Sequence, residues 1–176
     1  MVTEVNLSSF IKECVDIPRF YECCTQCPNF NVKWSCPPYD FDAEEIWKSH
    51  STVILFASKI LTPGELLSEN HSPDEINAIS RKLLRPVKDA MADSLLKMEA
   101  ETPGSLALFA GSCEICDVCA KKKGEPCLHP DRMRYSIESL GGNVEKALEL
   151  YFNEKMLWAG NGRLPEYFIL LGGLLK

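Results

Sequence analysis

The sequence predicts an α/β (or α+β) fold: a small sheet of three or more strands covered by helices, with a cysteine-rich metal-binding loop region. Short apolar runs rich in β-branched residues alternate with helical patterns along the chain. Eight of the nine cysteines fall into two windows, residues 23–39 and 111–130. With 176 residues, 45% of them hydrophobic, the chain is long enough to bury a core as one domain, residues 1–176.

The first third of the chain contains one predicted helix and one predicted strand. Residues 1–22 carry little pattern, and their structure is left open. Residues 23–39 predict a loop, because three prolines interrupt regular structure there. Asp40 or Asp42 can cap a short helix that ends near position 50. The run at 52–57 is continuously apolar, which is typical of a buried strand.

The middle of the chain predicts a long helix. Ser72 is suited to the N-cap, Pro73 to the first helical position, and Glu75 closes a capping box. Apolar side chains then recur at steps of three and four residues as far as Met98. This pattern predicts one face of a helix about seven turns long, by the 3.6-residue turn.

Four further elements follow the long helix. Residues 105–110 predict a second buried strand that leads directly into the second cysteine window. A helix is expected from about Ser136 to Gly141, and Asn143 can cap another. Residues 167–171 predict a third strand.

Charge and the N-terminal sequence restrict the partners and the compartment. The net charge of −6 argues against nucleic acid or an anionic membrane as the main partner. The one basic run, at 121–123, predicts a solvated loop tip, a docking patch for an acidic redox partner or a counter-charge for a cluster. The N-terminus resembles no signal peptide, so a cytoplasmic location is expected. Cytoplasmic thiols are kept reduced, which favours metal ligands over disulfides.

The second window carries the stronger metal signal. Cys113, Cys116 and Cys119 follow one another at Cys-x2-Cys steps, and Cys127 comes later. Structural zinc sites usually join two Cys-x2-Cys pairs across a spacer, whereas three thiols at such steps suit a [4Fe-4S] cluster. Cys127 or Cys36, which precedes a proline as in ferredoxins, is the candidate fourth ligand. Zn²⁺ and metal-free redox dithiols are the alternatives.

The first window supplies fewer well-spaced thiols. Cys24, Cys27 and Cys36 form a set of three. Cys23 is an additional candidate, although adjacent side chains such as those of Cys23 and Cys24 tend to point apart. A second cluster would take its fourth ligand from Cys23, Cys14 or a non-protein group. Otherwise both windows converge on shared sites. Cys14 by itself is typical of a small buried hydrophobe.

These motifs resemble a family of small, cysteine-rich microbial proteins described as predicted metal-binding proteins of unknown function, found mainly in anaerobic bacteria and archaea. The similar segments are Cys24-Thr-Gln-Cys27, Trp34-Ser-Cys36-Pro-Pro-Tyr, Gly111-Ser-Cys113-Glu-Ile-Cys116-Asp-Val-Cys119, Cys127-Leu-His-Pro and the stretch from Arg134 to Gly141. The resemblance implies a metal set of Cys24, Cys27, Cys36, Cys113, Cys116, Cys119 and Cys127. The family often has an arginine where this chain has Leu128, so Arg132 or Arg134 would have to replace it.

Three functions are compatible with these features. The first is an iron–sulfur protein with one or two [4Fe-4S]-type clusters, in electron transfer or another cluster-dependent redox role in an anaerobe, with a redox partner protein. The second is an enzyme with an open-site cluster on three Cys ligands. Candidates to hold its anionic substrate, or to orient the metal ligands, are His129, Asp131, Arg132 and Tyr135. The third is a zinc-stabilised protein-interaction module.

Overall fold

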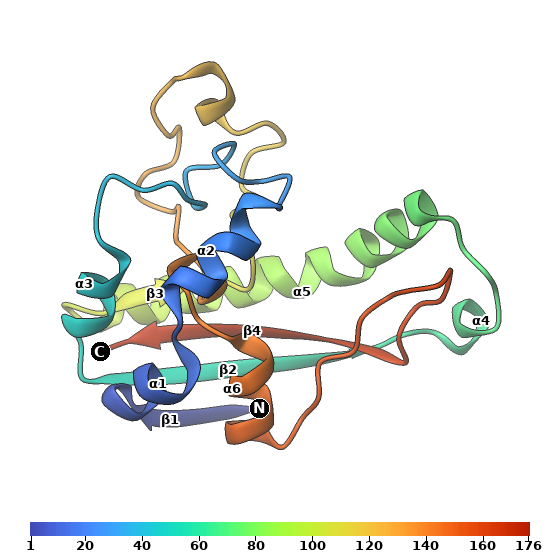
Figure 1. The fold of residues 1–176 in the computed structure, drawn as a ribbon, viewed down its shortest axis with the longest axis horizontal. Coiled ribbons are helices and arrows are strands. Elements are labelled where there is room, and N and C mark those ends of the chain that lie inside the picture. Colours follow the sequence, from blue (N-terminus) through green and yellow to red (C-terminus); the bar gives the residue numbers. More distant parts are fainter.

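A four-stranded sheet with strand order β1-β2-β4-β3 forms the centre of the molecule (Figure 1). The computed structural model describes residues 1–176. All neighbouring strands are antiparallel. The strands are β1 (Val2–Asn6), β2 (Thr52–Leu61), β3 (Leu106–Leu108) and β4 (Tyr167–Leu175). The predicted fold class is confirmed, and β1 is the strand that the sequence pattern had left open.

Helices pack against both faces of the sheet. One hydrophobic cluster joins α1, α3 and α6 to the sheet, and a second joins α5 to the opposite face. The helices are α1 (Leu7–Cys14), α2 (Ile17–Thr25), α3 (Ala43–Lys48), α4 (Gly64–Leu67), α5 (Pro73–Glu101) and α6 (Val144–Phe152), and the 3-10 turns are η1 (Ala120–Lys123) and η2 (Glu138–Leu140). No helix is both long and apolar enough to cross a membrane.

The central strand β2 is covered on both sides. Val53 and Leu55 belong to the cluster with α1, α3 and α6, whereas Ile54 and Phe56 pack toward α5. Side chains alternate between the two faces of a strand, so a strand covered on both faces has a continuous apolar sequence. This explains why 52–57 was recognisable, although β2 continues to Leu61.

The long helix α5 begins as predicted. The Ser72 side chain accepts a hydrogen bond from the Glu75 amide, and the Glu75 carboxylate accepts one from the Ser72 amide. Further along, α5 lies very close to β4. A Cβ atom on Gly172 would be 3.0 Å from both the Leu95 Cδ1 and the Met91 Sδ. Glycine at this position therefore permits the close approach of helix and sheet.

Three local predictions differ from the structure. The segment after Ser136 forms only the turn η2, because the Ser136 and Ser139 hydroxyls each accept a hydrogen bond from the other residue's amide, and Gly141 ends the turn with a φ of +90°. Cys23 and Cys24 do not lie in a loop. They form the end of α2, which Asp16 caps by accepting a hydrogen bond from the Arg19 amide. The predicted strand at 105–110 is also shorter, because only 106–108 pair with β4.

Candidate metal centre

The two cysteine segments lie together on one side of the molecule, although they are far apart in the sequence (Figure 1). The first leaves the C-terminal end of α2, and the second follows β3. Gly111 starts the second segment with a φ of +77°, a conformation that favours glycine. One helix end and one strand end therefore bring the two sets of thiols to the same place.

Direct hydrogen bonds join the two segments. The Lys33 ammonium donates to the Ser112 hydroxyl and to the Cys113 carbonyl, both at 3.0 Å. The Ser35 hydroxyl accepts a hydrogen bond from the Cys113 amide at 3.0 Å and lies 3.8 Å from the Cys36 Sγ. Ser35 is almost fully buried. It therefore holds the backbone of Cys113 in the second segment beside Cys36 in the first.

Lys121 adds a second connection between the segments. Its ammonium lies 5.1 Å from the centre of the Trp34 ring, within the range of a cation–π interaction. The Trp34 indole in turn donates to the Glu125 carbonyl at 3.1 Å. The Lys121 ammonium also donates, at 3.3–3.4 Å, to the backbone carbonyls of Lys33, Cys36 and Pro38. The first lysine of the basic run thus packs against the neighbouring segment and is not a free loop tip.

The thiols of the first segment influence one another. Burial raises the pKa of Cys24 to about 11, and the charges of Cys36, Cys27 and Cys23 add to this increase. Burial also raises the pKa of Cys36, against the opposing hydrogen bond with Ser35 and the charge of Lys33. A buried thiolate loses its hydration, so these groups are neutral thiols at pH 7 unless a cation binds them.

The second segment contains a separate set of neighbours. Burial raises the pKa of Cys113, and the charges of Cys127 and Cys116 increase it further. Cys119 is half-buried and directly precedes η1. The charge of Cys27 affects the pKa of Cys36, whereas the charges of Cys127 and Cys116 affect the pKa of Cys113. The thiols therefore form two groups, one in each segment.

The donor set suits a thiophilic metal. All nine cysteines are free thiols. In this conformation no three Cys, His, Asp or Glu side chains are close enough to enclose one ion, so binding would draw the thiols of a group together. The residues that would hold the metal are Cys24, Cys27, Cys36, Cys113, Cys116, Cys119 and Cys127. Cys23, on the exposed end of α2, is an additional candidate. Cys14 is buried in the core, with a pKa raised to about 11 by burial.

The predicted neighbours of the last cysteine occupy different surroundings. Tyr135 lines a cavity of about 480 Å³ together with Cys127 and Trp34. Arg132 is exposed and donates to Asp93 of α5 at 3.2 Å.

The remaining candidates near Cys127 face no cavity beside a candidate metal ligand. The Arg134 guanidinium binds the Glu99 carboxylate, with its Nε 2.9 Å from each oxygen. His129 is half-buried and its carbonyl accepts the Arg132 and Met133 amides, and Asp131 is exposed. Of the residues proposed to hold a ligand, only Tyr135 therefore lines a cavity next to a candidate metal ligand.

Sequence reasoning missed Lys33 and Ser35 as parts of the site. A lysine and a serine beside a cysteine carry no signal of their own. Their role depends on Ser112 and Cys113, which lie about 80 positions further along the chain.

Sheet, helices and paired thiol segments together define a cysteine-rich metal-binding α+β protein. The chain belongs to the family described as predicted metal-binding protein (DUF2284), whose model matches residues 12–171. No curated protein and no solved structure matches it. The family description agrees with the donor set but names neither the metal nor a reaction.

We expect Ser35→Ala to loosen the connection between the two segments. The substitution leaves the partly buried Cys113 amide without its acceptor, at a cost of about 1–3 kcal/mol in the free energy of unfolding. Urea unfolding of metal-free protein measures this loss. Ser9→Ala, at an exposed serine on α1, is the control and should change stability by less than about 0.5 kcal/mol. Equal stability of the two variants would contradict the assigned role of Ser35.

Proposed function

We propose that this chain is an iron–sulfur protein whose thiol groups hold one or two [4Fe-4S]-type clusters, and that it transfers electrons to or from a redox partner protein in the cytoplasm. The observation that carries the proposal is the packing of the two thiol segments through Lys33, Ser35 and Lys121. This packing keeps the two thiol segments together, and Cys113, Cys116 and Cys119 have the sequence spacing typical of cubane clusters. Such a cluster would supply reversible one-electron chemistry.

The surrounding charges favour anionic ligands. Lys33 and Lys121 bring two ammonium groups to backbone atoms of Cys113 and Cys36. Positive charge beside thiolates lowers the cost of deprotonating them and of adding an electron nearby. Burial has the opposite effect on the free thiols, since it raises the pKa of Cys24, Cys36 and Cys113. Metal binding is therefore expected to release protons.

A second candidate is an enzyme with a cluster on only three protein thiolates. It is favoured by Cys24, Cys27 and Cys36, which form a group of three well-spaced thiols. Such a centre leaves one metal position for substrate. Spectral changes on adding small anions such as cyanide distinguish it from an electron carrier.

Metal and acid-labile sulfide content, measured on protein purified without oxygen, tests the proposal. We expect a brown protein with about four or eight irons and an equal amount of sulfide per chain. Reversible reduction in a redox titration supports electron transfer. About one or two zinc ions without sulfide would contradict the iron–sulfur assignment and leave a zinc-stabilised interaction module.

A further inference from the structure

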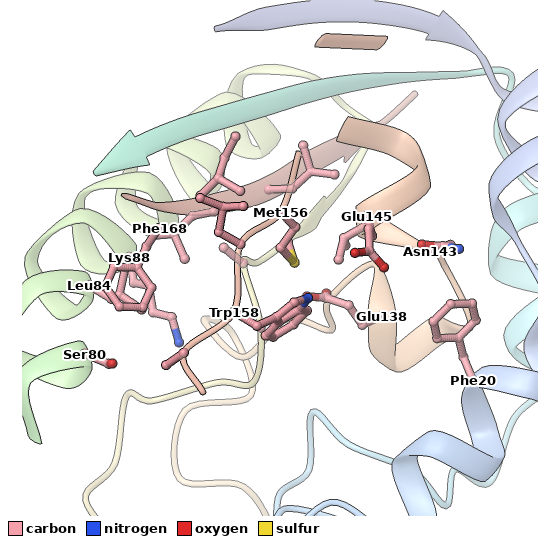
Figure 2. Close-up of a pocket in the computed structure, with 18 of the residues that line it drawn as sticks. Phe20, Ser80, Leu84, Lys88, Glu138, Asn143, Glu145, Met156, Trp158 and Phe168 are labelled. Atoms are coloured by element: carbon pink, nitrogen blue, oxygen red, sulfur yellow. The ribbon is translucent and has the colours of Figure 1, made fainter. Parts of the chain in front are cut away.

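A large cavity lies beside the thiol segments, between α2, α5, η2, β4 and the segment that follows α6 (Figure 2). Its volume is about 650 Å³, which falls within the range of small-molecule sites. Thirteen of its 21 lining residues are hydrophobic. Leu84, Met156 and Phe168 are among the side chains that form the apolar walls. Such a lining with a few polar groups is typical of sites for organic ligands.

One carboxyl group in this cavity has an unsatisfied oxygen. The Glu138 Oε2 is the only buried side-chain nitrogen or oxygen atom in the protein without a hydrogen-bond partner. Buried polar atoms are almost always paired, so an exception calls for a donor from outside the chain. The nearby Lys88 ammonium does not serve it, because it binds the Glu114 carboxylate at 3.1 Å.

An aromatic side chain lines the same cavity as this carboxyl group. Trp158 also lines the cavity, yet 72% of its surface is exposed (Figure 2). It belongs to the stretch between α6 and β4, which forms no helix or strand. An exposed indole offers a flat face that attracts cations and packs on apolar groups.

Among the charged side chains that line the cavity, only Glu138 lies away from solvent and has no charged partner, and the neutral polar residues Ser80 and Asn143 of the lining are half-buried. Lys88 is neutralised by Glu114. Arg19 and Glu145 are exposed and of opposite sign, so they lie toward solvent. The interior therefore combines one unpaired acceptor, one exposed aromatic face and apolar walls. A ligand that complements all three has a positively charged donor on an apolar body.

We propose that this cavity binds a small organic amine, whose ammonium group donates to Glu138 and lies against Trp158 while its apolar part fills the cavity. The site is distinct from the thiol groups but adjoins both. Gly111 lines the cavity two residues before Cys113, and Phe20 lines it one helical turn before Cys24 on α2. An amine bound here would lie close to the metal centre without being one of its ligands.

Calorimetric titration of the full-length protein with 2-phenylethylamine tests this proposal. We expect saturable binding of one molecule per chain, with a change in tryptophan fluorescence that is lost in Trp158→Phe. Glu138→Gln, which keeps the shape of the side chain, should weaken binding at least tenfold. Glu149→Gln is the matched control, because Glu149 is an exposed residue of α6 outside the cavity lining, and it should bind as the unmodified protein does.

The neutral analogue 2-phenylethanol separates charge recognition from filling of the apolar cavity. It should bind at least tenfold more weakly than the amine. The proposal is overturned by absence of saturable amine binding, by equal affinity of the unmodified protein and Glu138→Gln, or by equal affinity for the alcohol and the amine. Neither metal content nor the redox titration enters this test, so its failure leaves the iron–sulfur proposal unaffected.

Discussion

Cys116→Ala is expected to remove about half of the bound metal, and Cys27→Ala the other half. The reason is the grouping of the thiols, since Cys116 neighbours Cys113 whereas Cys27 neighbours Cys24 and Cys36. If each group holds its own centre, the loss of one thiolate leaves the other centre intact. Iron and sulfide analysis of both single variants and of the double variant measures the effect, and the double variant should contain almost no metal.

The same series distinguishes separate centres from a shared one. If Cys36 instead completes a single cluster on Cys113, Cys116 and Cys119, Cys116→Ala should remove almost all of the metal and Cys27→Ala, which removes no ligand of that cluster, almost none. Cys14→Ala is the control for removal of a thiol, because Cys14 lies in the core away from both groups. It should retain all of the metal. Cys23→Ala then shows whether Cys23 is a ligand.

Gly141→Ala is expected to destabilise the protein by about 3 kcal/mol or more, from two additive causes. Gly141 has a φ of +90°, which strains any residue with a Cβ atom. The new Cβ would also lie 2.6 Å from both the Cα and the Cγ1 of Ile17, at the start of α2. The backbone at Ile17 cannot move without shifting α2, which carries Cys24 at its other end.

Gly104→Ala provides a matched control for this prediction. Gly104 has a similar φ of +83°, but a Cβ atom there would meet nothing within 4 Å. Urea unfolding of both variants therefore separates backbone strain from the clash with α2. We expect a loss of about 1 kcal/mol for Gly104→Ala. An equal loss in both variants would show that α2 adjusts to the new methyl group without cost.

Local patterns were sufficient wherever an element is defined by its own residues. The strand β2 and the helix α5 were predictable because burial on both faces gives a continuous apolar run and because Ser72 and Glu75 form a capping box. Asn143 was predictable as the cap of α6, since its side chain accepts a hydrogen bond from the Lys146 amide. The spacing of Cys113, Cys116 and Cys119, which indicates a metal, is likewise a property of one short segment.

The tertiary structure decided what depends on contacts between distant segments. β1 exists as a strand because it pairs with β2, about 50 positions away in the sequence. Ser35 belongs to the site because it meets Cys113, 78 positions further along, and Glu138 lines a cavity that seven separate segments enclose. The local sequence does not distinguish Ser35 from an exposed serine, or Glu138 from an exposed glutamate. Only the fold determines which of these residues are buried. The sequence by itself therefore identified the thiols of this protein, and packing determined how they are grouped and what lies beside them.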